Sequence, residues 1–156
     1  MNRGKQFESR FLDDWKKSFL NSFIYRVSDQ VSGYKYTSSN MCDFICFSNG
    51  ILFLIECKEH KGNTFPLSNL TQYSKLKEKV GIPGVRVGVV IWFSDHDKIL
   101  YVPISTVTKM LQLNKKSINI KDLSSEEYVV YDIPVIKKKV FLNADYSVLK
   151  NLKEGE

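Results

Sequence analysis

The chain has 156 residues, of which 43% are hydrophobic and 26% are charged. This is the composition of an ordinary soluble globular protein, and the length predicts a single domain over residues 1–156. The longest apolar run outside residues 42–58 is Val85 to Phe93, which contains Arg86 and is too short to cross a bilayer, so a membrane protein is excluded. Lys and Arg outnumber Asp and Glu by 23 to 17, and the formal charge of +6 suits a polyanionic partner.

The first predicted element is an amphipathic helix over residues 5–24. Its apolar side chains recur at helical spacing with charges between them, so one face is expected to pack on a sheet. Glu8 lies early in this helix and is either a catalytic neighbour of the acids described below or a solvated charge. Residues 24–28 predict a short edge strand, and residues 32–40 predict a loop.

Residues 42–58 predict a β-hairpin around which the rest of the chain is organised. Two apolar runs flank Asn49-Gly50, a strong signal for a two-residue type I′ turn. If the residues on either side of the turn pair, the same register places Asp43 directly opposite Glu56. Because side chains alternate along a strand, both carboxylates and the ammonium group of Lys58 are expected on one face at the open end of the hairpin.

This arrangement of charges is costly for a purely structural sheet, because opposed carboxylates repel at this spacing. A divalent cation would offset the repulsion, and oxygen ligands favour Mg²⁺ or Mn²⁺. Lys58 would then hold an attacking water or stabilise charge that develops on a phosphate. The spacing alone leaves the alternative open that Lys58 only bridges the two acids in an exposed ion triad.

The three cysteines, Cys42, Cys46 and Cys57, all fall in this hairpin. Alternation predicts that Cys42 and Cys46 share one face and that Cys57 joins them by pairing opposite Cys42. A zinc site would lack its fourth ligand, so buried thiols in a reducing cytosol are favoured. Residues 1–8 are polar, unlike a signal peptide, and a cytoplasmic location is expected.

Beyond the hairpin, the pattern predicts a helix and two strands. The helix begins at a cap on Ser68 or Asn69 and carries Gln72. Residues 85–94 predict a buried strand and residues 99–102 a second one. The turn between them contains two acids and a histidine, which we interpret as hairpin polar residues because adjacent turn side chains diverge.

The last third of the chain completes an α/β pattern. A capped helix is predicted over residues 105–113, a strand over residues 128–133 and a terminal helix over residues 145–153. Helices and strands in this order predict a central mixed β-sheet flanked by helices. The basic loop at residues 115–117 either grips phosphates or is simply solvated. The lysine run at residues 137–139 is interpreted mainly as a contribution to solubility.

The order of the charged residues in the hairpin resembles a known catalytic motif. Asp43 followed by Glu56-Cys57-Lys58 is similar to the core of the restriction-endonuclease-like, or PD-(D/E)xK, nucleases. Three further segments narrow the resemblance: Asn2-Arg3-Gly4-Lys5, Phe65 to Leu70, and Lys116-Ser117-Ile118. In this order they resemble RecU, the Holliday junction resolvase family of Gram-positive bacteria and some of their phages.

The resemblance implies a restriction-endonuclease-like core and a Mg²⁺- or Mn²⁺-dependent endonuclease that resolves four-way DNA junctions in recombination and repair. Asp43 and Glu56 would ligate the metal, together with the backbone carbonyl of Cys57, and Lys58 would position the water. Glu8 and Gln72 would assist, although Gln72 falls about two residues early against the RecU glutamine. Two symmetric cuts imply a homodimer, acting in the bacterial cytoplasm. The residues expected to contact DNA are Arg3, Lys5, Lys61, Lys75, Lys115, Lys116 and Ser117.

The sequence departs from the RecU pattern before the hairpin. Family members carry a longer stalk there, and only about a dozen residues replace it, with Met41 where the family has a hydroxyl residue. Two alternatives therefore stay open. One is a nuclease of the same fold that acts on flaps or ordinary duplex, and the other is a DNA-binding protein of this fold without catalysis.

Overall fold

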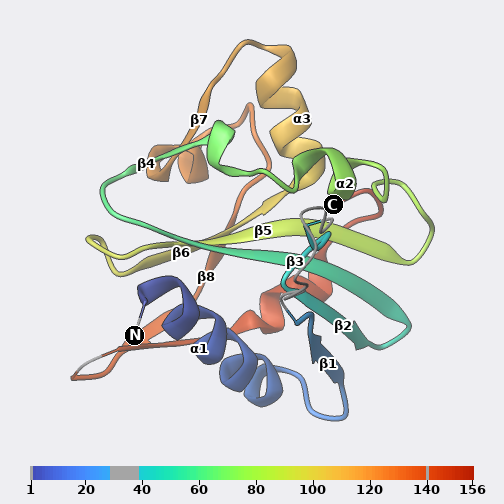
Figure 1. Ribbon diagram of the computed structural model, residues 1–156, viewed down its shortest axis with the longest axis vertical. Coiled ribbons are helices and arrows are strands. Elements are labelled where there is room, and N and C mark those ends of the chain that lie inside the picture. The colour runs from blue at the N-terminus through green and yellow to red at the C-terminus, as the bar shows by residue number, and fades with distance from the viewer. Residues whose placement is uncertain (1, 29–38, 140) are drawn as a thin grey trace, which may run out of the picture.

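The computed structural model describes residues 2–28, 39–139 and 141–156. Its centre is a six-stranded sheet with the strand order β1-β2-β3-β5-β6-β8, in which β3 and β5 are parallel and the other neighbours are antiparallel. Helix α1 covers one face of this sheet, and α2 and α3 lie on the other (Figure 1). The predicted α/β class with a mixed sheet is confirmed.

The elements alternate between strands and short helices. The strands of the main sheet are β1 (Phe23–Arg26), β2 (Phe44–Ser48), β3 (Ile51–His60), β5 (Val85–Phe93), β6 (Lys98–Pro103) and β8 (Tyr131–Ile133). Two small sheets pair β4 (Thr64–Pro66) with β7 (Ser117–Asn119) and β9 (Val135–Lys137) with β10 (Leu142–Ala144). The helices are α1 (Arg3–Ser18), α2 (Tyr73–Lys77) and α3 (Ile104–Gln112), with 3₁₀ turns η1 (Leu67–Asn69), η2 (Ile120–Ser124) and η3 (Tyr146–Asn151).

The β2–β3 hairpin has the predicted turn and register. Asn49 and Gly50 have φ values of 51° and 78°, and a type I′ turn requires positive φ at both central positions. Ser48 pairs with Ile51, and the ladder continues to the pair of Phe44 and Ile55. The hairpin prediction is therefore confirmed over this length.

Helix α1 packs through an aromatic stripe on the first face of the sheet. Phe7, Phe11 and Trp15 are buried and spaced about one helical turn apart. They meet Phe44 and Phe53, which the alternation of β2 and β3 places on this same face. Each buried aromatic side chain contributes roughly 1.5–3 kcal/mol of stabilisation, so this contact fixes α1 across the hairpin.

A second core fills the other face, under α2 and α3. Leu54 of β3 lies there with Val87 and Val89 of β5, and Val107 and Met110 of α3 cover them. Glu56 and Lys58 follow Leu54 at alternate positions of β3, so their side chains project from this face.

The structure corrects three predicted helices. Helix α1 ends at Ser18 rather than residue 24, and the chain turns at Asn21, where φ is 58°. The helix predicted from Ser68 or Asn69 is only η1 followed by the short α2, because Leu70 leaves the helical region with ψ at 72°. The terminal helix is the 3₁₀ turn η3.

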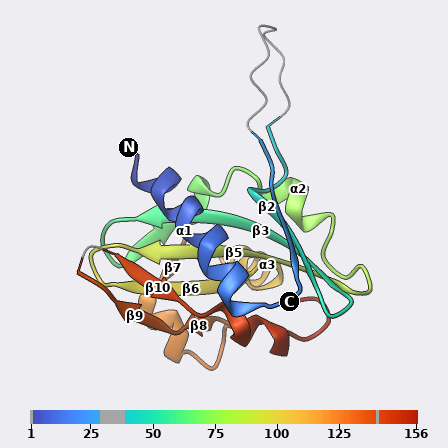
Figure 2. The same ribbon diagram turned by 90° about the horizontal axis from the view of Figure 1, so that it is seen from below.

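The end of the chain forms a hairpin that the sequence pattern did not predict. The expected strand over residues 128–133 is reduced to β8, and β9 and β10 then pair beside α1 (Figure 2). The loop predicted over residues 32–40 lies mostly outside the described residues. Within the described part of the chain, no helix is long and apolar enough to cross a membrane.

Candidate active site

Asp43 stands immediately before β2 and ends the ladder instead of extending it. Its backbone N–H donates to the carbonyl of Ile55 at 3.1 Å, although Phe44 is the residue paired with Ile55. Its carboxylate oxygen Oδ2 accepts a hydrogen bond from the backbone N–H of Cys57 at 2.8 Å. The predicted direct pairing of Asp43 with Glu56 is therefore wrong, because the chain bends at Asp43. The Asp43 side chain accepts the hydrogen bond of a β3 backbone N–H that the backbone of a continued β2 strand would otherwise accept.

The carboxylate of Glu56 is buried beside that of Asp43. The Glu56 side chain is only 2% exposed, and its Oε1 lies 2.8 Å from Nζ of Lys58. Its Oε2 is buried and receives no hydrogen bond from an N–H or O–H donor among the residues that the structure describes, and the Asp43 carboxylate lies within hydrogen-bonding reach of Glu56. The two acids and the lysine that the motif predicted therefore lie together, although they meet through a bend and not through a regular pair.

Burial dominates the electrostatics of the two acids. It raises the pKa of Glu56 to about 7, the negative charge of Asp43 raises this pKa as well, and Lys58 lowers it. Burial also raises the pKa of Asp43, whereas the Cys57 N–H and the charge of Lys58 oppose that shift. Without a further positive charge, the pair is therefore reluctant to ionise completely near neutral pH.

The acids lie where β3 extends beyond the end of its ladder with β2. Strand β3 pairs with β5 up to His60 opposite Phe93, but its ladder with β2 stops at Ile55. The segment from Glu56 to His60 therefore has a strand partner on one side only, apart from the hydrogen bond that Asp43 accepts. The carboxylates therefore lie at an edge of β3 that no strand among the described residues covers.

Helix α1 brings Glu8 to the same end of the hairpin. Glu8 forms an ion pair with Arg26 of β1. Burial is the main cause of the raised pKa of the Cys57 thiol, and the charge of Glu8 adds to it. The charge of Arg26 opposes the rise that burial causes in the pKa of Asp43. Arg26 was not predicted as a site residue. Its place in the edge strand could have indicated it, because Arg26 pairs with Phe44, the residue that follows Asp43.

The chemistry of these donors fits a hard divalent cation. Oε2 of Glu56, which has no donor among the described residues, and the adjacent Asp43 carboxylate are oxygen ligands of the kind that Mg²⁺ and Mn²⁺ prefer. Among residues 2–28, 39–139 and 141–156, no three His, Cys, Asp or Glu side chains gather as a metal-binding group. Mg²⁺ typically takes one or two protein carboxylates and completes its shell with water and phosphate.

Comparison with known proteins identifies the family. The family model described as "RecU: Recombination protein U" matches residues 4–143. The chain belongs to the RecU family. Among solved structures, Hjc from Archaeoglobus fulgidus, a Holliday junction resolvase from an archaeal hyperthermophile, aligns with a TM-score of 0.50 and 19% identity over 76% of this chain and 88% of that one. A search of the curated proteins finds no match.

These findings confirm two predictions that rested on the motifs. The RecU resemblance is confirmed by the family match, and the restriction-endonuclease-like core is confirmed by the shared fold with Hjc. The shortened RecU stalk segment, about residues 28–40, falls mostly outside the described residues. Its effect on junction recognition stays a prediction.

The cysteines do not lie as alternation predicted. Cys46 and Cys57 belong to the core under α1, but Cys42 is buried in the core on the opposite face. The bend at Asp43 adds a residue to the strand and so reverses the direction of the side chain that precedes it. All three thiols are free, and burial raises their pKa values, so the Cys57 thiol is a poor ligand and only its carbonyl remains a candidate.

Two predicted residues lie on the connection after β3. Gln72 stands at the N-terminal end of α2, where its Oε1 accepts a hydrogen bond from the hydroxyl of Thr71 at 3.0 Å. Lys75 of α2 donates to the backbone carbonyl and the hydroxyl of Ser39, which lies four residues before Asp43. Lys75 therefore borders the approach to the acids, and the catalytic assignment of Gln72 stays a prediction.

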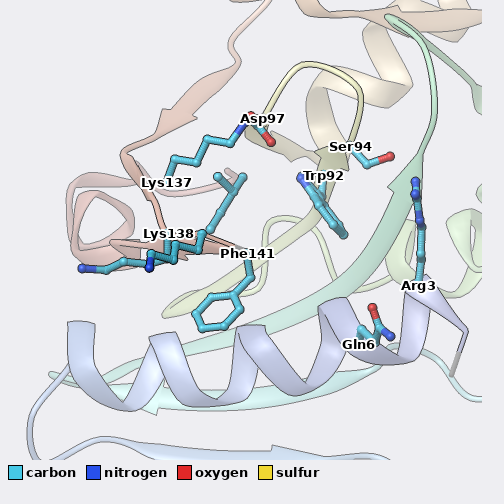
Figure 3. A pocket seen from close by; sticks show the side chains of 10 residues that line it. Arg3, Gln6, Trp92, Ser94, Asp97, Lys137, Lys138 and Phe141 are labelled. Atoms are coloured by element: carbon cyan, nitrogen blue, oxygen red, sulfur yellow. Dashed lines mark hydrogen bonds and ion pairs between the residues drawn. The ribbon is translucent and has the colours of Figure 1, made fainter.

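The N-terminal cations occupy two sides of the molecule. Arg3 lies 3.9 Å from Glu59, the residue after Lys58, and lines a groove between α1 and the β9–β10 hairpin (Figure 3). Lys5 is exposed on α1, and Lys61 is exposed just beyond β3. These positions are open to a nucleic acid, and their contacts with DNA stay predictions.

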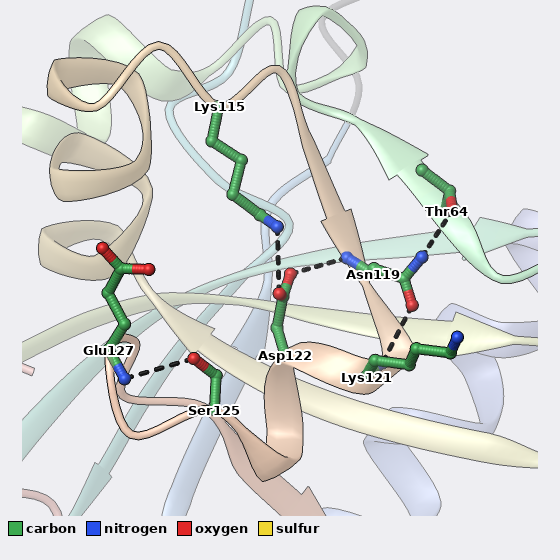
Figure 4. Close-up of polar contacts among 7 residues, drawn as sticks. All are labelled: Thr64, Lys115, Asn119, Lys121, Asp122, Ser125 and Glu127. Carbon is green, nitrogen blue, oxygen red and sulfur yellow. Dashed lines mark hydrogen bonds and ion pairs between the residues drawn. The ribbon is translucent and has the colours of Figure 1, made fainter.

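The basic segment after α3 is more structural than expected. Lys115 Nζ donates to Oδ1 of the buried Asp122 at 2.9 Å, and Asp122 Oδ2 accepts the backbone N–H of Asn119 at 2.7 Å (Figure 4). Lys116 is exposed, and Ser117 begins β7. Of this trio, Lys116 has the side chain that is most available to a phosphate.

Proposed function

We propose that this protein is a Holliday junction resolvase that cuts DNA by metal-dependent phosphodiester hydrolysis. Membership of the RecU family and a fold shared with a Holliday junction resolvase support this function. The observation that carries the metal dependence is the buried Oε2 of Glu56, which lies beside the Asp43 carboxylate and has no donor among the described residues. Such a charge arrangement is costly in isolation and is relieved by a cation.

Asp43 and Glu56 would hold Mg²⁺ or Mn²⁺, together with the backbone carbonyl of Cys57. When bound, the ion supplies a Lewis acid that polarises the phosphate and lowers the pKa of a water. The hydrogen bond from the Cys57 N–H fixes one oxygen of Asp43, so this carboxylate is oriented before any ion arrives. This preorganisation reduces the entropy lost on assembling the site.

Lys58 is proposed to orient the attacking water. Its ammonium group is 2.8 Å from Glu56 Oε1 and its side chain is 23% exposed, so it touches the buried acid and still reaches solvent. An ammonium group in this position donates hydrogen bonds to a water or to a phosphate oxygen, and it places positive charge where negative charge develops. The same contact limits the repulsion between Glu56 and Asp43.

A homodimer is proposed because resolution of a junction requires two symmetric cuts. Phe23 and Phe47 form a cross-strand pair, and Tyr25 lies two residues along on the same face. All three aromatic side chains are about half exposed, at 55%, 47% and 52%. An exposed apolar patch of this kind marks an interface. Glu56 and Lys58 project from the same face of the sheet as this patch, so a dimer formed through the patch would carry both active sites on that face.

The main rival is a nuclease of the same fold that cuts flaps or ordinary duplex DNA. The shortened segment before the hairpin favours this alternative, since it replaces the RecU stalk. A resolvase acting on cellular DNA would work in the cytoplasm of a bacterium, whether its gene is bacterial or phage-borne.

Labelled four-way junction, flap and linear duplex, each incubated with and without Mg²⁺, test the proposal. We expect paired, symmetric cuts in the junction that require the cation. Lys58→Ala serves as the inactive control, and Lys121→Ala removes an exposed lysine outside the candidate site. Cutting of plain duplex at the same rate as junction would favour the rival, and full activity in EDTA would contradict the metal mechanism.

A further inference from the structure

A groove on the α1 face of the sheet contains six cations that the catalytic site does not use. It runs between α1 and the β9–β10 hairpin in adjoining hollows that share Phe141, the two larger ones of about 350 Å³ and 490 Å³. Figure 3 shows Arg3 and Gln6 rising from α1, and Lys137, Lys138 and Phe141 extending from the hairpin. The cationic lining residues are Arg3, Arg10, Lys17, Lys137, Lys138 and Lys139.

The two acids along the described lining are partly engaged, and Oδ1 of the buried Asp14 has no hydrogen-bond partner among the described residues. Asp97 binds Lys137, and the buried Asp14 accepts the backbone N–H of Ala144 at 2.9 Å. Two donors in the wall, Nε of Arg10 and Nε1 of Trp92, have no acceptor among the described residues. The groove is therefore rich in positive charge and in donors, which is the composition that attracts phosphate.

The cations of α1 form a track. Arg3, Arg10 and Lys17 recur every seven residues, which places them along one side of the helix. At 1.5 Å per residue they extend over roughly 20 Å, whereas one DNA strand carries a phosphate about every 3.4 Å along its axis. A track of this length suits several successive phosphates and is too long for a single phosphate ion or mononucleotide.

The central cation of the track is held rigidly. The Arg10 guanidinium stacks on Phe141 at 3.7 Å from the ring centroid and donates to Oδ1 of Asn143 at 2.9 Å. A guanidinium fixed in this way loses little conformational entropy when it meets a phosphate. A basic face that served only solubility would not need such an anchored side chain.

The groove and the catalytic acids lie on opposite faces of the sheet. Trp92, which lines the groove, contacts Phe7 of α1, whereas Glu56 and Lys58 project from the face under α2 and α3. The two regions meet at Glu59, whose partner is Arg3. A straight duplex engaged at Lys58 would have to bend around the end of β3 to enter the groove, and bending costs energy. The diverging arms of a junction reach both regions without that cost.

We propose that this groove binds the phosphate backbone of a junction arm other than the one being cut, and so contributes to selection of branched over linear DNA. The proposal rests on the function proposed above and adds a second contact surface to it. The contact is to backbone phosphates and is independent of base sequence.

Charge reversal at Lys138 and Lys139 tests the groove, with Lys121→Glu/Lys153→Glu as a matched control at exposed lysines outside the groove. Affinities for an immobile four-way junction and for linear duplex of equal length are measured in EDTA over a range of salt. We expect Lys138→Glu/Lys139→Glu to lose at least about tenfold in junction affinity, to lose under about threefold for duplex, and to reduce the salt slope for the junction by about 2.

Equal losses for junction and duplex, or equal losses in the control, would overturn the proposal. A photo-crosslinker attached at Lys138→Cys locates the contact independently, with crosslinks expected on an arm that the same protomer does not cut. Crosslinks confined to the cut arm would also overturn it. If the unmodified protein neither binds nor cuts the junction, the proposed function fails. If the unmodified protein binds and cuts the junction, but the groove variant has the same junction affinity as the control variant, the groove proposal alone fails.

Discussion

The ammonium group of Lys58 lies 2.8 Å from one oxygen of the Glu56 carboxylate, and the other oxygen of that carboxylate is buried without a hydrogen-bond donor among the described residues. Lys58 therefore both balances a buried charge and stands next to the proposed metal position. We expect Lys58→Ala to reduce junction cleavage by about 10²- to 10⁴-fold, because a positioned donor of protons or charge contributes on that scale. Single-turnover cleavage at saturating enzyme measures this loss.

The matched control separates chemistry from binding. Lys121→Ala removes an exposed lysine outside the candidate site and should leave the cleavage rate within about threefold, because isolated surface changes have small effects. Junction affinity should be nearly unchanged in Lys58→Ala, as measured by electrophoretic mobility in EDTA. Wild-type cleavage by Lys58→Ala would show that the lysine only bridges the two acids.

Metal affinity should depend on pH with a definite sign. The metal-free pKa of Glu56 is raised to about 7 by burial and by Asp43, so protons compete with the cation below that pH. We expect the increase in melting temperature caused by Mg²⁺ to be small near pH 5.5 and to grow as the pH rises to about 8, because only the ionised carboxylate is a ligand. Thermal unfolding at several Mg²⁺ concentrations measures it, and Asp43→Asn should blunt the response at every pH.

Without metal, the same group should make stability fall with rising pH. The pKa of Glu56 is raised from 4.5 to about 7 on folding, so between these values the folded state holds a proton that the unfolded state releases. The contribution of Glu56 to the free energy of unfolding is fully present below its pKa in the unfolded chain. This contribution is lost as the pH rises toward and through its pKa in the folded protein, by at most about 1.4 kcal/mol per pH unit. Denaturant unfolding in EDTA checks this, and Glu56→Gln should flatten the profile. An unchanged slope in Glu56→Gln would show that other groups cause it.

The sequence predicted the hairpin because its signals are local. Asn49-Gly50 determines the turn, and the apolar runs determine which face of each strand is buried. The motif also brought Asp43, Glu56 and Lys58 together correctly. The bend at Asp43 was not predictable from spacing, because it depends on competition between ladder hydrogen bonds and one side-chain contact with the Cys57 N–H. That single added residue reversed Cys42.

Elements that depend on distant packing were predicted less well. The helix expected from Ser68 has apolar residues at helical spacing, but the chain there forms η1 instead. The backbone N–H of Leu67, at the start of η1, donates to the carbonyl of Lys116 at 2.9 Å. The β9–β10 hairpin lacks a strong turn signal, so its lysines were interpreted as solvated. Their place opposite Arg10 and Lys17 becomes visible only when α1 is docked.

The exposed aromatic face should control oligomeric state. Phe47→Asp places a charge in the patch formed with Phe23 and Tyr25, and we expect it to convert the proposed dimer to a monomer. Ile136→Asp is the matched control, since Ile136 is 66% exposed on β9 and away from this patch. Light scattering coupled to size-exclusion chromatography measures the mass of each variant. A dimer that survives Phe47→Asp would place the interface elsewhere.

Lys115 and its neighbour Lys116 should respond differently to the same substitution. Lys115 donates to the buried Asp122, which in turn holds the backbone N–H of Asn119, so Lys115→Ala leaves a buried carboxylate without one of its donors. We expect a loss of about 1–3 kcal/mol in the free energy of unfolding, with junction affinity reduced less than about threefold while the protein is folded.

Lys116 is exposed, so Lys116→Ala should leave stability within about 0.5 kcal/mol and reduce the salt slope of junction binding by about 0.9, the value for one lost phosphate contact. Urea unfolding and salt-dependent binding of both variants distinguish the two lysines. The Asp122→Asn variant, alone and combined with Lys115→Ala, then measures the coupling between the pair, which should be favourable because the two side chains are in contact. If Lys115→Ala instead weakens DNA binding and leaves stability unchanged, the ion pair with Asp122 is secondary and Lys115 binds phosphate as the RecU resemblance implied.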